Sequence, residues 1–404
     1  MPVAYAAPET FHGTSLFLGL AYAPAAHTAR NGYTMTYNPL CDAHTLTRPK
    51  DRDSLVLTYH YFGQDPEGFA RDIAVEQSIE FPVKYVRSEA ILANIIPRVL
   101  SIKPIEGGSE IKLSFNPAVA GPDFVQFLNV LFGNISMKFD VKLVDIAFAP
   151  CMFECRGPRF GLEGIRALTH AEAGSPVLAS ALKPMGLETQ AFAHIAASFV
   201  ERGMHLIKDD HGLANQAFAP FKARVRAVSE AVAEANARLG RHTLYAPNIS
   251  GPVEELMARA HFAKEAGAGA LMVAPGLMGY DAIRALRADD TLALPILAHP
   301  SFLGMCALNP RQGLSYGIAF GTLNRYAGAD VIIFPNHGGR FAFTLDDCRE
   351  IFDASLSPNP MMKRALPAPA GGMKVENIGT IADTYRTHDF VALIGGDMYR
   401  PWAE

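Results

Sequence analysis

The chain has 404 residues, of which 49% are hydrophobic and 19% are charged, and its formal net charge at pH 7 is -4. This composition supplies a buried core and excludes a disordered protein, while the length favours two domains. No basic stripe runs along the sequence, so nothing recommends a nucleic-acid partner.

We expect no signal peptide at the amino terminus. The apolar run at 16–23 is short and no Lys or Arg precedes it, and no stretch reaches the length of a membrane span. We therefore expect a cytoplasmic protein with no membrane partner. The cysteines lack the paired spacing of a zinc site, so we expect buried, reduced thiols. They are Cys41, Cys151, Cys155, Cys306 and Cys348.

The first 160 residues alternate strand-like and helix-like segments without a regular repeat. LVLTYHYF, GSEIKLSFNP and VKLVDIAFAP read as strands, whereas PEGFARDIAVEQSIEF and FVQFLNVLFG have helical spacing. Such a mixture is typical of a domain built on an antiparallel sheet. We predict an α+β, ferredoxin-like domain at 1–160.

A regular alternation of strands and helices begins near residue 165. Segments with helical spacing, such as FKARVRAVSEAVAEANARLG, separate eight apolar runs of strand length, which fits a (β/α)8 TIM barrel at 161–404 and an α/β fold class. The segment after the last run is too short for a normal eighth helix. The runs are 176–184, 204–210, 242–250, 270–276, 295–301, 330–336, 364–372 and 390–396.

Polar residues and glycines end nearly every run, and catalytic groups of such barrels lie at the carboxyl ends of the strands. At the second run, Lys208 and Asp210 share a strand face, while Asp209 and His211 point elsewhere unless the chain turns at Gly212. Oxygen ligands and an imidazole can hold a divalent ion, but a protonated lysine cannot. Carbamylation by carbon dioxide would turn Lys208 into an oxygen ligand. A lysine and aspartate ion pair at the barrel mouth is the alternative.

Two further strand ends carry candidate acid and base groups. Lys183 ends the first run, and a lysine partly buried beside other cations loses proton affinity, so it can serve as a general acid or base. The alternative is an exposed lysine before a proline. His299 ends the fifth run, where it is either a satisfied core histidine or, as its place in the series favours, a site residue.

Glycine pairs follow the last two runs, where barrels of this kind commonly bind phosphate through backbone N–H groups. They are Gly371 with Gly372 and Gly395 with Gly396, and Arg340 in NHGGR is a possible second anion contact. Tight turns that need glycine are the alternative.

Taken together, these segments resemble the RuBisCO large-chain superfamily across almost the entire chain. GMHLIKDDHG is similar to the segment with the carbamylated lysine and acidic ligands, ALKPMGL to the first-strand lysine motif and PILAHP to the fifth-strand histidine. AVEQSIEF and LFGNISM resemble the amino-domain segments with an active-site glutamate and asparagine. The glycine pairs match the phosphate loops.

The resemblance implies a magnesium ion held by a carbamate on Lys208 together with Asp210 and His211. It also implies a homodimer or an assembly of dimers, in which Glu76 and Asn134 complete the site of the partner chain.

The departures from the carboxylating members concern carbon dioxide and a second phosphate. His211 stands in place of a glutamate, Met185 of a second lysine, Pro300 of a phosphate-binding arginine and Ala370 of a serine. The loop PNHGGRFAF lacks the lysine that closes over carbon dioxide. The resemblance is therefore to the RuBisCO-like, non-carboxylating branch.

The chemistry expected of that branch is metal-assisted enolisation of a phosphorylated ketose, with Lys183 as the base. The resemblance implies an isomerase of 5-methylthioribulose 1-phosphate or a related methionine-salvage enolase, and the retained Asn134 and the apolar Met185 favour a substrate with one phosphate and an apolar tail, hence the isomerase. The alternatives are a decarboxylase or hydrolase of a branched sugar-acid phosphate and, if His211 abolishes metal binding, a non-catalytic binding or regulatory relative.

Overall fold

The computed structural model describes residues 54–147 and 156–402. The apolar run at 16–23 and three of the cysteines, Cys41, Cys151 and Cys155, lie outside the described residues. Within the described ranges, every helix is too short or too polar to cross a membrane.

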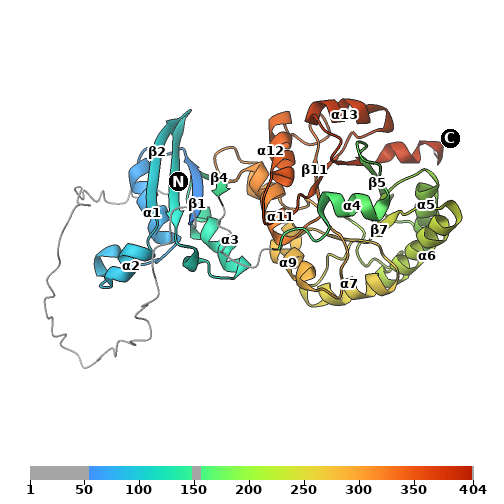
Figure 1. Cartoon of the computed structure of the whole chain (residues 1–404), viewed down its shortest axis with the longest axis horizontal. Helices are drawn as coiled ribbons and strands as arrows, with labels where there is room; N and C mark the ends of the chain where they lie inside the picture. The colour runs from blue at the N-terminus through green and yellow to red at the C-terminus, as the bar shows by residue number, and fades with distance from the viewer. Residues whose placement is uncertain (1–53, 148–155, 403–404) are drawn as a thin grey trace, which may run out of the picture. The chain divides into compact units, whose positions relative to one another are not determined.

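The amino-terminal domain has the predicted ferredoxin-like architecture (Figure 1). Its elements follow the order βαββαβ, and the strands pair antiparallel in the order β4-β1-β3-β2. A two-residue strand from the barrel, β10 (Gly313–Leu314), adds to the free side of β4 in parallel. The elements are β1 (Leu55–Tyr61), α1 (Pro66–Glu76), α2 (Glu89–Asn94), β2 (Arg98–Ile105), β3 (Gly108–Phe115), α3 (Phe124–Phe132) and β4 (Val141–Ala147).

Alternation along β1 builds the core of this domain. Leu55, Leu57 and Tyr59 are fully buried, as the period of two of a strand requires, and Phe127 of α3 belongs to the same core. Asp65 caps α1 by accepting a hydrogen bond from the amide of residue 68. Strand β2 was not predicted from the sequence, because its residues are mostly exposed at the edge of the sheet and show no apolar alternation.

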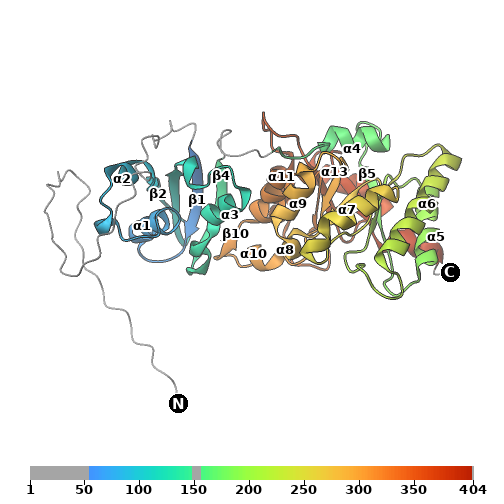
Figure 2. The ribbon, with the colours of Figure 1, turned by 90° about the horizontal axis from the view of Figure 1, so that it is seen from below.

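The carboxyl-terminal region is a closed barrel of eight parallel strands, as predicted. Figure 2 shows this region turned by 90°, with helices along its outer side. Strand pairing runs in the order β7-β6-β5-β13-β12-β11-β9-β8, and a parallel bridge between Asn248 and Met272 joins β7 to β8. Each strand falls within one of the eight apolar runs. The strands are β5 (Val177–Leu182), β6 (Leu206–Asp209), β7 (Leu244–Ala246), β8 (Leu271–Val273), β9 (Ile296–Ala298), β11 (Val331–Pro335), β12 (Leu366–Ala370) and β13 (Val391–Ile394).

Helices surround the barrel, and a 3-10 segment at Gly396–Trp402 follows β13 (Figure 1). The helices are α4 (Gly161–Thr169), α5 (Thr189–Glu201), α6 (Phe221–Leu239), α7 (Leu256–Glu265), α8 (Pro275–Met278), α9 (Tyr280–Ala288), α10 (Gly304–Ala307), α11 (Leu323–Ala327), α12 (Leu345–Leu356) and α13 (Ile378–Tyr385), with a π-helical stretch at Gly317–Thr322.

Helix α4 closes the end of the barrel at which the strands begin. Its Leu162 and Ile165 share a core cluster with inward side chains of the strands. The carboxylate of Asp330, fully buried before β11, accepts hydrogen bonds from the amides of Phe160 (2.7 Å), Gly161 (2.8 Å) and Ile296 (2.9 Å). Burial raises the pKa of Asp330, and these amides oppose the rise. The end of the barrel at which the strands terminate is not covered by α4 and can hold a functional site.

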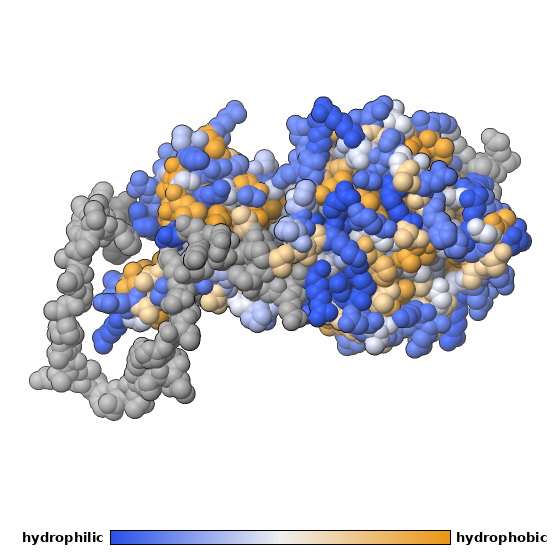
Figure 3. Space-filling view, viewed as in Figure 1, coloured by the Kyte–Doolittle hydropathy of each residue, from blue (hydrophilic) through white to orange (hydrophobic). Residues whose placement is uncertain are grey.

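Apolar residues cover much of the visible surface of the amino-terminal domain (Figure 3). Among its exposed large apolar side chains are Phe81, Tyr85, Val99, Leu100, Met137 and Phe139. Of the two described cysteines, Cys348 is buried and free, as expected. The expectation was wrong for Cys306, which is free but half-buried because it lies on α10 in the loop after β9.

Candidate active site

A cavity of about 1020 Å³ opens at the carboxyl ends of the barrel strands. The structure brings all ten barrel residues singled out in the sequence to its lining, as the position of strand ends in a barrel predicts. They are Lys183, Lys208, Asp210, His211, His299, Arg340, Gly371, Gly372, Gly395 and Gly396.

Lys208 lies at the end of β6 and is only 4% exposed. Its Nζ donates to the carbonyl oxygen of Asp209 at 2.9 Å. Burial lowers the pKa of Lys208 to about 8, and the charge of Lys183 acts in the same direction, whereas Asp210 opposes it. More of this amine is therefore unprotonated near neutral pH than of an ordinary lysine, and the unprotonated amine is the form that reacts with carbon dioxide.

The carboxylate of Asp210 is the centre of the charged groups. Its Oδ1 lies 3.2 Å from Nζ of Lys183 and 3.5 Å from Nδ1 of His211. Burial by itself would raise the pKa of Asp210, but the hydrogen bond from His211 and the charges of Lys183 and Lys208 outweigh burial and lower it. Asp210 is therefore a carboxylate anion that can pair with a lysine or bind a metal cation.

His211 reaches the cavity because β6 ends at Asp209 and the chain turns at once. Its ring stacks on that of His299 with the centroids 4.7 Å apart. Nδ1 of His299 accepts from the amide of Ser301 at 3.2 Å. Burial and the nearby positive charges lower the pKa of His299 well below its ordinary range, so the ring is neutral and Nε2 carries its proton.

Asp209 faces away from the cavity, as the period of two predicts. Its carboxylate pairs with the fully buried Arg224 of α6 at 3.2 Å and accepts from the hydroxyl of Tyr245 at 2.8 Å and the amide of Asn248 at 3.0 Å. The side chain of Asn248 donates to the carbonyl of His211 at 3.0 Å. This network holds the turn that carries the metal-ligand candidates.

The two glycine pairs in the lining of the cavity differ in their backbone conformation. Gly371 and Gly372 have φ angles of +91° and +71°, a region that L-residues rarely adopt, so glycine is required by the backbone there. Gly395 and Gly396 have no positive φ, and the space around them is open. Nδ2 of the Asn377 side chain donates to the carbonyl of Gly372 at 3.0 Å and fixes the turn.

Several lining residues were missed in the sequence. Lys374 follows the glycine turn and adds a second cation on the same side as Arg340. Phe302 and Phe341 line the mouth although they are 61% and 49% exposed. Met185, one of the two residues that favoured a substrate with an apolar tail, does not line the cavity. The signal for Lys374 was its position directly after PAGGM.

The two candidates of the amino-terminal domain lie beside each other. Nδ2 of Asn134 donates to Oε1 of Glu80 at 2.6 Å and lies 3.4 Å from Oε2 of Glu76. The lining of the barrel cavity includes neither Glu76 nor Asn134. Within one chain, Glu76 and Asn134 therefore lie next to each other but do not line the barrel cavity of that chain.

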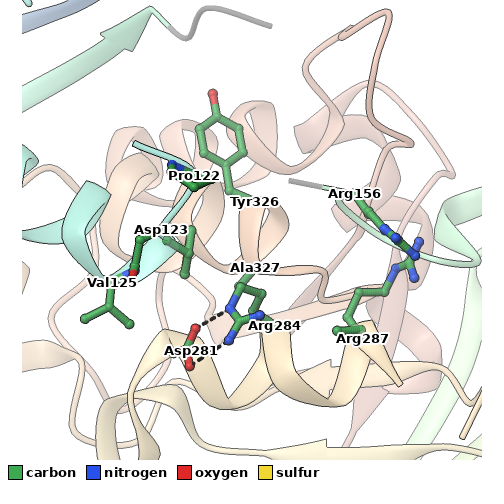
Figure 4. A pocket seen from close by; sticks show the side chains of 11 residues that line it. Pro122, Asp123, Val125, Arg156, Asp281, Arg284, Arg287, Tyr326 and Ala327 are labelled. Atoms are coloured by element: carbon green, nitrogen blue, oxygen red, sulfur yellow. Dashed lines mark hydrogen bonds and ion pairs between the residues drawn. The ribbon is translucent and has the colours of Figure 1, made fainter. Parts of the chain in front are cut away.

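A second cavity, of about 520 Å³, contains none of the predicted site residues (Figure 4). Asp281 and Arg284 form an ion pair in its wall, and Arg287 donates to the carbonyl of Gly157 at 2.9 Å. Its charged side chains are thus engaged with neighbouring groups of the protein.

The side chains at the end of β6 form an incomplete donor set for magnesium. Within the described ranges, no three His, Cys, Asp or Glu side chains form a group that could hold a metal ion. Asp210 and His211 would supply two ligands, and a carbamate on Lys208 would supply the third as an oxygen. The residues fit magnesium once Lys208 is modified, and its buried, weakly basic amine suits that modification.

A ferredoxin-like domain followed by a barrel with a lysine and an aspartate at the end of its second strand defines the class of RuBisCO-type proteins. The family model of the ribulose bisphosphate carboxylase large chain, catalytic domain, matches residues 164–341. The chain belongs to the RuBisCO large-chain family, as the relatives below show.

The relatives are RuBisCO-like proteins. The chain is 37% identical over 353 residues to ribulose bisphosphate carboxylase-like protein 1 of Rhodopseudomonas palustris (86% of this chain, 93% of the relative). It is 36% identical over 334 residues to 5-methylthioribulose-1-phosphate isomerase of Rhodospirillum rubrum (82% and 87%). It is 34% identical over 295 residues to a putative 2,3-diketo-5-methylthiopentyl-1-phosphate enolase of Shouchella clausii (72% and 78%).

The fold agrees with these relatives. The crystal structure of a Rubisco-like protein from Rhodopseudomonas palustris superposes with a TM-score of 0.77 at 36% identity, covering 85% of this chain and 94% of that one. The predicted family and fold class are confirmed.

Proposed function

We propose that the protein enolises a phosphorylated ketose in the manner of a methionine-salvage enzyme, as a 5-methylthioribulose-1-phosphate isomerase or a closely related diketo-phosphate enolase. The observation that carries the proposal is one cavity in which Lys183 lies 3.2 Å from the carboxylate of Asp210 and a turn of two left-handed glycines lies in the same lining. The relatives named for these two activities support it.

The substrate phosphate would bind the amides of Gly371 and Gly372, with Lys374 and Arg340 adding positive charge. Binding there would fix the phosphate end of the substrate, so that the carbonyl on the adjoining carbon and the neighbouring C–H are held at a set distance from the glycine turn. In solution these groups would sample many orientations, so this positioning lowers the barrier to proton transfer.

Lys183 is the proposed base that removes the proton next to the carbonyl. Nζ of Lys183, which lies 3.2 Å from Asp210, would accept that proton as the neutral amine and become an ammonium. The neutral His299 offers an N–H to a substrate oxygen as negative charge develops. Magnesium held by carbamylated Lys208, Asp210 and His211 would supply the Lewis acidity that polarises the carbonyl.

Apolar side chains at the mouth support a substrate with one phosphate and an apolar tail. Phe302, Leu308 and Phe341 line the cavity. Two cations, Arg340 and Lys374, lie on the side of the glycine turn, and Pro300 stands where carboxylating members carry an arginine. We therefore expect no fixation of carbon dioxide onto ribulose 1,5-bisphosphate.

The proposed assembly is a homodimer or a set of dimers. Glu76 and Asn134 lie outside the cavity of their own barrel, which suits residues that complete the site of a partner chain. The apolar surface of the amino-terminal domain offers area for such a contact. The division into domains 1–160 and 161–404 and a place in the cytoplasm stay predictions.

Proton exchange tests the proposed function. The protein is incubated with magnesium, bicarbonate and 5-methylthioribulose 1-phosphate in deuterated water, and deuterium in the recovered sugar phosphates is measured by NMR. We expect incorporation by the wild type, none by Lys183→Gln, and full incorporation by Lys264→Gln, a matched change on α7. No incorporation by the wild type with this sugar or with a diketo phosphate refutes enolisation.

Metal dependence is tested separately with Lys208→Met, which keeps much of the buried volume of the side chain. Magnesium and bicarbonate should then no longer raise activity, and magnesium binding measured by calorimetry should disappear. Unchanged binding would show that Lys208 is not a ligand.

A further inference from the structure

The hydroxyl of Tyr399 bridges two backbone groups at the end of β5. It accepts a hydrogen bond from the amide of Lys183 at 2.7 Å and donates to the carbonyl of Ala181 at 2.7 Å. Both distances are those of strong hydrogen bonds. No motif in the sequence pointed to this tyrosine.

The hydroxyl of Tyr399 takes the place of backbone partners on β13, because β13 ends before β5 does. The amide of Val177 donates to the carbonyl of Phe390, so odd-numbered residues of β5 present their backbone groups to β13. The pairing of β13 with β5 stops at Ile394, which lies opposite Ser180. Beyond that pair, the carbonyl of residue 181 and the amide of residue 183 would have no ladder partner, and the tyrosine hydroxyl satisfies both.

Two contacts hold Tyr399 in place, one to its ring and one to the backbone just before it. It makes an edge contact with Phe199 of α5, with the ring centroids 5.4 Å apart. Nη1 of Arg202, the residue after α5, donates to the carbonyl of Met398 at 2.5 Å. Packing on α5 and the hydrogen bond to the carbonyl of Met398 therefore fix the position of the hydroxyl. Through its two hydrogen bonds, the hydroxyl in turn fixes the backbone at the end of β5.

We propose that Tyr399 is a positioning residue, which fixes the backbone of Lys183 so that its Nζ meets both Asp210 and the carbon acid of the substrate. This inference rests on the proposed role of Lys183 as the base. Lys183 has 40% of its side chain exposed and a long flexible stem, so its tip is aimed by its backbone and by one contact with Asp210.

The test variant is Tyr399→Phe, which keeps the ring against Phe199 and removes only the hydroxyl. Because small displacements of a reacting group cost up to about 100-fold in rate, we expect kcat for the sugar phosphate to fall about 10-fold or more while KM changes less than about 2-fold. The matched control is Tyr280→Phe, which removes another hydroxyl bonded to a backbone carbonyl, that of Ala319 at 2.7 Å. It should show a similar shift in Tm and an unchanged kcat.

A second readout does not depend on activity. Each protein is treated briefly with acetic anhydride, and acetylation of Lys183 is quantified by peptide mass spectrometry relative to the exposed Lys222. We expect the labelling ratio to change at least about 2-fold in Tyr399→Phe and to stay constant in Tyr280→Phe. If wild type lacks enolisation, the proposed function fails and this ratio still decides the positioning.

Equal falls of kcat in the two tyrosine variants, or an unchanged labelling ratio of Lys183 in Tyr399→Phe, would overturn the inference.

Discussion

Replacing Gly371 by alanine tests the phosphate turn, and the structure sets the size of the effect. Gly371 has a φ of +91°, and an added Cβ would meet no atom within 4 Å. The change therefore adds no collision, only the cost of about 1–2 kcal/mol that an L-residue pays in a left-handed conformation. The turn can relieve that strain by rotating, which moves its amide away from the phosphate.

The expected loss of binding follows from one such amide. A hydrogen bond to a charged group contributes about 1.5–3 kcal/mol, and 1.4 kcal/mol is a factor of ten. Gly371→Ala should therefore raise KM for the sugar phosphate, and the inhibition constant of inorganic phosphate, about 10-fold to 100-fold. Initial rates over a range of substrate and phosphate concentrations measure both constants.

Gly174 provides the matched control. It has a φ of +80° with no neighbour within 4 Å, but it lies before β5, at the other end of the barrel. Gly174→Ala should lower Tm by a similar amount and leave both constants unchanged. Equal effects of the two variants on phosphate binding, or no effect of Gly371→Ala, would refute the reasoning.

Three further predictions address the metal, the assembly and the fold. His211→Glu supplies a harder oxygen ligand and should tighten magnesium binding measured by calorimetry, whereas an unchanged affinity would exclude His211 as a ligand. Glu76→Gln mixed with Lys183→Ala should regain part of the wild-type activity, because one hybrid site receives intact residues from both chains; no recovery after verified subunit exchange contradicts a shared site. The pKa of Asp330 is raised in the folded protein, so its contribution to stability is fully present below the ordinary value of 3.8 and is lost as pH rises through the folded pKa. In urea unfolding, wild type should accordingly lose stability relative to Asp330→Asn as pH rises above about 4, and a difference independent of pH would contradict the shift.

The barrel could be predicted from the sequence because its strands repeat and are buried on both faces. Even LPAPA, with two prolines, was found from its place in the series, and it forms β12. The edge strand β2 was missed because RVLSIKPI is mostly exposed, so burial imposes no pattern on it. Regular spacing and burial, and not β propensity, supplied the signal.

The residues of the candidate site also divide into those that the sequence predicts and those that only the structure shows. The period of two separated Lys208 and Asp210 from Asp209, but the entry of His211 into the cavity depends on a backbone turn that spacing does not encode. Tyr399 acts through hydrogen bonds to backbone atoms of another strand. Such a role depends on where β13 ends relative to β5, which only the three-dimensional structure gives.

The small strand β10 has a consequence for biosynthesis. Gly313 and Leu314 pair with Lys142 and Leu143 of β4, and Nζ of Lys142 donates to the carbonyls of Ala307 (3.0 Å) and Asn309 (2.8 Å). The outer edge of the amino-terminal sheet is thus covered only by residues that follow some 170 positions later in the sequence. During translation the ribosome must deliver more than half of the barrel before the outer edge of β4 is covered, and until then that edge is open to pairing with other chains.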